Sequence, residues 1–268
     1  MAKKNHKKSK SPNDTVPIVA ETMPTYAVPP NDLECTTVWS FPVRGEWATH
    51  NASYRGNWAP QIPRNLILRY TKEGDTVLDQ MMGAGTTLVE CRLLNRKGIG
   101  IDINPDSIRL AQKHLTFTCE HAPSIVIRRG DARDLSAMPD ASVDLIATHP
   151  PYVDIVKYSE GKILEDLSNI HDVKTFCDEL ERIAQECFRV LKPNKFCAIL
   201  MGDTRRKGFY IPLAYRVLER FLKVGFVLKE DVIKAQHNCR MTGYWRSQSQ
   251  RFNFLLIMHE HLFIFKKP

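Results

Sequence analysis

The stretch Thr76-Val-Leu-Asp-Gln-Met-Met-Gly-Ala-Gly-Thr-Thr87 decides the fold of this chain. Its first four residues form an apolar run typical of a buried parallel strand, and its glycines let the backbone turn sharply where a helix begins. A second apolar run, residues 143–147, leads into His149-Pro150-Pro151-Tyr152. Both loops therefore leave strands at their carboxyl ends, which is the edge where open α/β sheets bind ligands.

Strand-like runs and helical patterns continue to alternate along the chain. Strands are predicted at residues 76–79, 98–102, 125–128, 143–147, 196–201, 226–234 and 261–265. Helices are predicted at residues 60–70, 86–95, 105–115, 174–191 and 211–223. This order predicts an α/β fold with a doubly wound, mainly parallel sheet and right-handed crossovers, in which the last two strands could form an antiparallel edge.

Length and composition indicate one domain with an N-terminal arm. The chain has 268 residues, 43% of them hydrophobic, which is enough for a sizeable core. Residues 1–34 are basic and rich in proline, so we expect a disordered arm there and a single domain over residues 35–268. No apolar run approaches the length of a membrane span, and no apolar stretch follows the basic N-terminus as in a secretory signal.

The seven cysteines and the net charge indicate a compartment and a class of partner. The cysteines form no C-x-x-C pair, which favours reduced, mostly buried thiols in the cytoplasm. The net charge of +8 favours a polyanionic partner, although five of the lysines lie within the first ten residues. Those lysines could attract phosphates or merely keep the arm soluble.

Three predicted strands in succession end at a carboxylate. Asp79 precedes the glycines, Asp102 follows about 20 residues on, and Asp131 ends the third strand. A carboxylate at the second position can accept both hydroxyls of a ribose, and one at the third could accept an amino proton from adenine. Together with the glycines they favour a site for a nucleotide-like cofactor.

An aromatic segment, residues 38–58, precedes this core and contains three tryptophans and two Arg-Gly pairs. Two interpretations stay open. The aromatic side chains could pin a loop to the core, or they could line a pocket and stack on a flat ligand.

These motifs resemble a known family of enzymes. Residues 79–87 resemble the cofactor loop of S-adenosylmethionine-dependent methyltransferases, and residues 149–152 resemble the [Asp/Asn/Ser]-Pro-Pro-[Tyr/Phe/Trp] motif of DNA amino-methyltransferases, which modify N4 of cytosine or N6 of adenine. Residues 60–79 are similar to the motif that packs on the methionine moiety. The resemblance implies a Rossmann-like methyltransferase sheet, S-adenosyl-L-methionine as cofactor, and cofactor contacts from Asp79, Met81, Gly83, Gly85, Thr86, Thr87, Asp102, Ile103, Asp131 and Ala132.

The proline loop suits the chemistry of such enzymes. An exocyclic amine is a poor nucleophile, so the enzyme must accept a hydrogen bond from it while its lone pair turns toward the methyl group. The prolines fix the backbone so that carbonyl oxygens can accept, and Tyr152 can stack on the base. A base paired in a duplex must first be flipped out. We therefore expect the catalytic residues to be His149, Pro150, Pro151 and Tyr152.

His149 departs from the family pattern, which has Asp, Asn or Ser at this position. Histidine offers an acceptor only as neutral imidazole. It could accept through a ring nitrogen, it could pack while backbone carbonyls accept, or the site could be inactive or altered in its substrate. With an unperturbed pKa of about 6.5, activity would decline as the pH drops from neutral to mildly acidic values. The preceding Thr148 resembles the Thr-Ser-Pro-Pro-Tyr form and favours N4 of cytosine.

Residues 235–253 hold three arginines and three aromatic residues but no acid, as expected of a surface that reaches phosphates and base edges. A solvated loop is the alternative. A short basic stretch, residues 203–207, follows an earlier strand on the same edge of the sheet. The candidate residues for nucleic-acid binding are Arg205, Arg206, Arg240, Tyr244, Trp245, Arg246 and Arg251.

The run His259-Glu260-His261 resembles a metal cluster only superficially. Strand alternation puts the two histidines on one face and the glutamate on the other, so we expect structural roles and no metal site.

The sequence therefore predicts a cytoplasmic, nucleoid-associated DNA amino-methyltransferase of the restriction-modification or orphan kind. The expected partner is DNA with its base flipped into the pocket, and a specificity subunit or a cognate restriction nuclease is a further candidate. Two alternatives stay open: an RNA base amino-methyltransferase, and an inactive nucleic-acid-binding homologue.

Overall fold

The structure is a computed structural model that describes residues 25–26, 33–238 and 241–268. Most of the predicted arm, residues 1–34, lies outside the described residues, as does Arg240. Among the described residues no helix has the length and apolarity needed to cross a bilayer. Six of the cysteines are described, and all six are free thiols, four of them buried.

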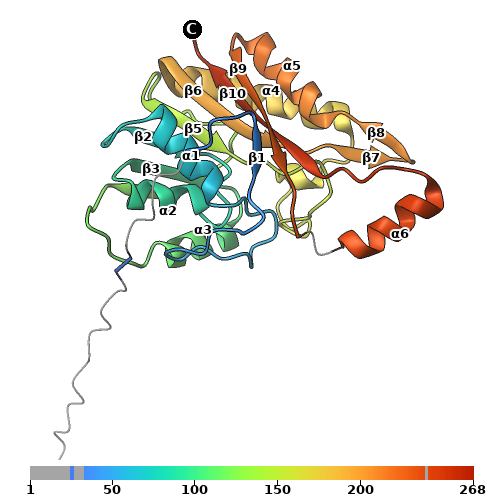
Figure 1. The fold of residues 1–268 in the computed structure, drawn as a ribbon. Coiled ribbons are helices and arrows are strands. Elements are labelled where there is room, and N and C mark those ends of the chain that lie inside the picture. The colour runs from blue at the N-terminus through green and yellow to red at the C-terminus, as the bar shows by residue number, and fades with distance from the viewer. Residues whose placement is uncertain (1–24, 27–32, 239–240) are drawn as a thin grey trace, which may run out of the picture.

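An eight-stranded sheet forms the centre of the fold (Figure 1). The strands lie in the order β1 (Val38–Ser40), β9 (Val227–Ala235), β10 (His259–Lys266), β6 (Leu191–Met201), β5 (Val143–Thr148), β2 (Thr76–Asp79), β3 (Lys97–Asp102) and β4 (Ile125–Arg129). β10 runs antiparallel to both β6 and β9, and the other pairs are parallel. The predicted doubly wound, mainly parallel sheet is confirmed. Its edge beyond β9 is β1, a strand of three residues that the apolar pattern does not predict.

Five helices cover the two faces of the sheet (Figure 1). Alternate strand residues separate the two apolar cores: Val77 and Leu145 pack with α1, whereas Leu78 and Ile146 pack with α4 and α5. The helices are α1 (Gln61–Tyr70), α2 (Thr86–Leu93) and α3 (Pro105–His114) on one face, and α4 (Val173–Val190) and α5 (Leu213–Val224) on the other.

Gly85 joins the cofactor loop to α2 and is required by two geometric constraints. Its φ of 81° is left-handed, and a Cβ there would lie 2.9 Å from the Cβ of Ala111 on α3. A side chain would therefore strain the turn and push α3 away from α2. This glycine shapes the start of α2.

Four further elements escape the apolar pattern. β7 (Thr204–Arg206) and β8 (Phe209–Ile211) form a small hairpin, η1 (Leu167–Asn169) is a single 3-10 turn, and α6 (Thr242–Phe252) lies within the segment for which a solvated loop is the alternative. None of the residues of α6 is buried, so the sequence shows no apolar stripe there. Figure 1 shows α6 at the end of an arm, well away from the sheet.

Candidate active site

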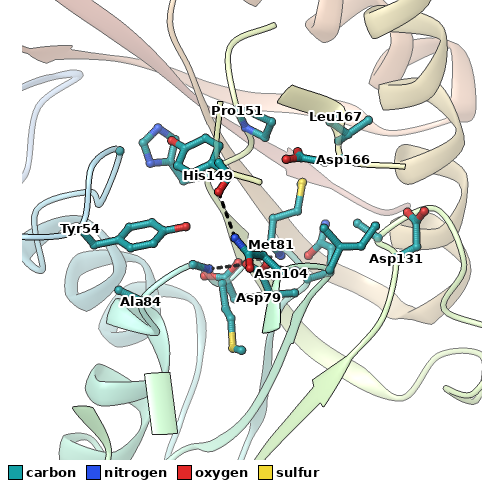
Figure 2. Close-up of a pocket in the computed structure, with 18 of the residues that line it drawn as sticks. Tyr54, Asp79, Met81, Ala84, Asn104, Asp131, His149, Pro151, Asp166 and Leu167 are labelled. Carbon is teal, nitrogen blue, oxygen red and sulfur yellow. Dashed lines mark hydrogen bonds between the residues drawn. The ribbon is translucent and has the colours of Figure 1, made fainter. Parts of the chain in front are cut away.

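A cavity opens where β2, β3, β4 and β5 end (Figure 2). Its empty volume is about 790 Å³, including the part open to solvent, within the range of small-molecule sites. The two predicted loops meet here, because both contribute to its lining. The predicted residues that line it are Asp79, Met81, Gly83, Asp102, Ile103, Asp131, Ala132, His149 and Pro151.

Asp102 at the end of β3 holds the glycine loop in place. Its Oδ2 accepts a hydrogen bond from the backbone N–H of Gly83 at 2.9 Å, and its Oδ1 accepts one from Asn104 at 2.8 Å. Each oxygen keeps a further lone pair for a ligand. Burial raises the pKa of this carboxyl to about 6, against the two backbone hydrogen bonds, which lower it.

Asp79 connects the glycine loop, residues 79–87, to β5, the strand that leads into the proline loop, residues 149–152. Its Oδ2 accepts from the hydroxyl of Thr87 at 2.5 Å, and its Oδ1 accepts from that of Thr148 at 3.0 Å. Burial raises the pKa of Asp79 to about 7, although these hydrogen bonds lower it. Thr87 and Thr148 do not line the cavity themselves. They hold the carboxyl group of Asp79, which does.

Aromatic side chains form the wall beside His149. Trp58 stacks on the imidazole with ring centroids 5.7 Å apart and planes 23° from parallel, and Tyr54 stacks on Tyr158 at 5.9 Å and 18°. Trp39 and Trp58 are both buried in one core cluster, and Trp58 also lines the cavity. Both interpretations of residues 38–58 thus apply: the segment is pinned to the core, and its end lines the pocket.

His149 is the first member of a series of hydrogen bonds that leads from the cavity lining to the buried Glu260. Its Nε2 lies 2.6 Å from the hydroxyl oxygen of Tyr152, which donates to Oε1 of Glu260 at 2.8 Å. Lys234 donates to Oε2 of Glu260 at 2.9 Å. Although burial favours the neutral acid, Lys234 and His149 lower the pKa of Glu260 below its usual value. An ionised Glu260 therefore lies behind the catalytic loop.

These hydrogen bonds determine which nitrogen of His149 carries the proton. An ionised carboxylate only accepts hydrogen bonds, so Tyr152 donates to Glu260 and the histidine Nε2–H donates to the tyrosine oxygen. A neutral imidazole with its proton on Nε2 carries its lone pair on Nδ1. Burial lowers the pKa of His149 to about 4; Lys234 also lowers it, while Glu260 and the Gly56 backbone raise it. The unperturbed pKa assumed for His149 is therefore wrong, and any fall in activity due to its protonation is expected at more acidic pH.

The remaining predicted residues of the two loops lie outside the cavity lining, which includes neither Pro150 nor Gly85. Thr86 donates to the side-chain oxygen of Asn57. The ring of Tyr152 packs against Gly202, where a Cβ would come within 2.5 Å of it. Tyr152 is thus placed to orient His149, and its predicted stacking on a base stays a prediction.

Asp131 lines the cavity with its charge already balanced. Arg133 donates to both of its oxygens, from Nε at 2.9 and 3.0 Å and from Nη2 at 2.6 Å. Arg133 is held in turn by Glu179 at 2.7 Å. The predicted contact with an adenine amino group would have to share these oxygens with Arg133.

The candidate residues for nucleic-acid binding separate into two groups. Arg205 donates to the carbonyl of Leu255 at 2.9 Å, and Arg206 forms an ion pair with Asp154, so both already hold parts of the protein together. The other described candidates project from α6 and are exposed: Tyr244, Trp245, Arg246 and Arg251.

Comparison with known proteins identifies the family. A family model described as DNA methylase matches residues 1–113 and 143–268, which is most of the chain. The chain belongs to this family. A second model, an RMKL-like methyltransferase domain, matches residues 66–183. The predicted resemblance is confirmed, and the family uses S-adenosylmethionine.

Curated relatives match shorter segments. The Type II methyltransferase M.HpaI of Haemophilus parainfluenzae is 50% identical over 50 residues, 19% of this chain and 16% of its own. M2.DpnII of Streptococcus pneumoniae is 46% identical over 70 residues, 26% of this chain and 25% of its own. A tRNA (guanine(10)-N2)-dimethyltransferase of Methanothermobacter thermautotrophicus is 34% identical over 103 residues, 37% of this chain and 29% of its own. This chain thus spans less than a third of these relatives.

Solved structures share the fold. A SAM-dependent methyltransferase of Methanosarcina mazei superposes with a TM-score of 0.54 and 18% identity, covering 75% of this chain and 96% of that one. The predicted Rossmann-like architecture is confirmed.

The cavity fits S-adenosylmethionine in shape and charge. Gly83 and Asp102 both line the cavity, and Asp102 would be the residue that offers lone pairs to the ribose hydroxyls of a bound cofactor. The carboxyls of Asp79, Asp102 and Asp166 line a cavity that no lysine or arginine lines among the described residues, which suits a cationic sulfonium. When bound, this cofactor supplies an electrophilic methyl group.

Cofactor affinity is expected to fall as the solution becomes acidic. The charge of Asp102 is present above its pKa of about 6 and lost below it. With only the ionised form competent to bind, the dissociation constant should rise about tenfold between pH 8 and pH 5. Calorimetric titration at several pH values measures this, and Asp102→Asn should remove the part of the dependence that Asp102 causes, leaving the part due to Asp79, whose pKa of about 7 lies in the same range. Equal wild-type affinities at pH 5 and pH 8 would contradict this assignment.

Proposed function

We propose that the chain transfers a methyl group from S-adenosylmethionine to an exocyclic amine of a DNA base, with N4 of cytosine favoured over N6 of adenine. One observation carries the proposal: His149 and Pro151 of the proline loop line the same cavity as Gly83 and Asp102. A methyl donor held by one loop would therefore face an amine held by the other.

The protein's part in the reaction is to orient the amine and accept its hydrogen bond. The unprotonated nitrogen of a neutral His149 is the acceptor, and carbonyl oxygens of the proline loop assist it. Hydrogen bonds through Tyr152, Glu260 and Lys234 hold the imidazole in place, so the ring need not reorient when the amine binds. Trp58 and Tyr54 offer aromatic faces to a flipped base.

Two features support DNA and cytosine. The relatives from Haemophilus parainfluenzae and Streptococcus pneumoniae are Type II methyltransferases, which fits a restriction-modification role with a nuclease or specificity subunit as partner. Thr148 before the proline loop resembles the form that goes with N4-cytosine specificity.

An RNA base amine is the second candidate substrate. The tRNA (guanine(10)-N2)-dimethyltransferase relative aligns over 103 residues, more than either restriction-type relative reported above. Its target is also an exocyclic amine, so the same acceptor chemistry would serve.

A transfer assay distinguishes these substrates. Tritiated S-adenosylmethionine is incubated with duplex DNA of mixed sequence or with unmodified tRNA, and the products are hydrolysed to nucleosides. We expect label in N4-methylcytosine from DNA. Label only in tRNA would favour the second candidate, and label in neither would favour an inactive binding protein.

α6 is expected to add electrostatic affinity for DNA. Arg246 and Arg251 are exposed, with Tyr244 and Trp245 beside them. Their double replacement by alanine should lower the slope of log affinity against log salt by about 2, because each phosphate contact releases roughly 0.9 counterion. Fluorescence anisotropy with duplex DNA measures the slope.

The control removes two positive charges from α4, Lys174→Ala with Arg182→Ala, both on exposed side chains. This pair should leave the slope nearly unchanged. Equal slopes for the α6 variant and the wild type would show that α6 does not lie on the phosphates.

A further inference from the structure

Behind the proline loop, the start of β10 and the residues that follow β6 carry polar side chains. Glu260 points to Tyr152, whereas His259 and His261 lie on the opposite face, as strand alternation predicts. Asp203 follows the carboxyl end of β6, and β6 pairs Met201 with His261. Asp203 therefore joins the two histidines from a neighbouring strand.

The three side chains converge. One donor atom from each of Asp203, His259 and His261 lies within 4.8 Å of the other two. His261 Nδ1 lies 3.0 Å from Asp231, which fixes the ring, and its Nε2 faces Oδ2 of Asp203 at 3.8 Å. That second distance is too long for a hydrogen bond, so a lone pair and a carboxylate oxygen face each other across a gap.

The charges of the cluster also lack a strong counterion. The side chain of Asp203 is 1% exposed, yet its only ion-pair partner among the described residues is His261. Asp231, whose side chain is 29% exposed, also has His261 as its only ion-pair partner among the described residues. Asp203 is otherwise satisfied by the hydroxyl of Tyr210 and by the backbone N–H of Ala214 at 2.8 Å. Two carboxylates therefore share one histidine, and a buried charge needs balance.

We propose that Asp203, His259 and His261 bind a divalent transition-metal ion, for which Zn²⁺ is the best match. Two imidazoles and one carboxylate are a preferred ligand set for zinc, and a ligating histidine characteristically donates its other N–H to a carboxylate, as His261 can to Asp231. In the tetrahedral geometry of zinc, ligands at about 2.1 Å from the ion lie about 3.4 Å apart. Donor atoms that now lie within 4.8 Å of one another must therefore approach one another by up to about 1.4 Å.

The position of the site gives it a structural role. Gly202, next to Asp203, packs on the ring of Tyr152, and Glu260, between the histidines, accepts from its hydroxyl. A metal ion would connect the end of β6 to the start of β10, where the segment that carries α6 rejoins the sheet (Figure 1). It would thus brace Tyr152 and the base of that segment.

Metal binding by the full chain tests the site without any transfer assay. Chelator-treated protein is titrated with ZnCl₂ by calorimetry, and with Co²⁺ while the visible absorption is recorded. We expect one Zn²⁺ per chain, d–d bands for Co²⁺, and a higher melting temperature with the metal. His259→Ala should weaken Zn²⁺ binding at least tenfold, by about 1.4 kcal/mol or more. His121→Ala, which removes an exposed histidine elsewhere, should bind as the wild type does.

Circular dichroism and S-adenosylmethionine affinity confirm that each variant is folded. An absence of stoichiometric Zn²⁺ binding by the wild type would overturn the proposal. Equal Zn²⁺ affinity in folded His259→Ala would also overturn it, because the ion would then be held by other groups.

Discussion

Replacing His149 with alanine is expected to slow single-turnover methyl transfer on the order of a hundred-fold or more. The change removes the proposed acceptor of the amine hydrogen bond and the ring that stacks on Trp58. Cofactor affinity should change little, because the ribose and the glycine loop are held by other residues. Rapid-quench transfer to DNA and calorimetry with S-adenosylmethionine measure the two effects separately.

The pH profile of the same reaction distinguishes an acceptor from a packing residue. The pKa of His149 is lowered to about 4, so the neutral acceptor persists above that value and is lost as the pH falls through it. The rate should therefore show no histidine step between pH 5.5 and 8. His149→Ser should recover part of the rate, because its hydroxyl offers an oxygen. Equal rates for the wild type and the alanine variant would show that His149 only packs.

Replacing Asp102 with alanine is expected to weaken S-adenosylmethionine binding about ten- to a hundred-fold, since losing charged hydrogen bonds costs roughly 1.5 to 3 kcal/mol. The structure adds a second reason. The carboxylate accepts from the backbone of Gly83 and Asn104, so its removal also loosens the glycine loop. Calorimetry at pH 8 measures the loss.

Asp102→Asn separates these two contributions. The amide keeps one oxygen and nearly the same shape but loses the negative charge. It should bind the cofactor more weakly than the wild type and more tightly than the alanine variant. Wild-type affinity in the alanine variant would exclude Asp102 from the cofactor site.

The fold was largely predictable because its strands carry strong local signals. Buried parallel strands read as apolar runs, and residues 76–79 and 143–147 lie within one residue of β2 and β5. The missed elements lack such a signal. β1 has only three residues, and α6 buries none of its side chains, so neither leaves an apolar period in the sequence.

Half of the candidate site was predictable for a similar reason. Asp102 and His149 follow apolar strands directly, and parallel strands bring their carboxyl ends to one edge. The support of His149 was not predictable, because Glu260 lies 108 residues from Tyr152 in sequence and meets it only through the antiparallel insertion of β10. Nor does any local motif mark Tyr158, which joins the wall by stacking on Tyr54.

Sequencing of DNA from cells that express the chain tests its proposed activity most directly. Single-molecule sequencing maps modified bases in a host without its own modification, for the wild type and for His149→Ala. We predict N4-methylcytosine at one short recurring motif with the wild type, and its loss or strong depletion with the variant. Unmodified host DNA in cells that contain soluble, cofactor-binding wild-type protein, together with new N2-methylguanosine in tRNA, would contradict the assignment to DNA.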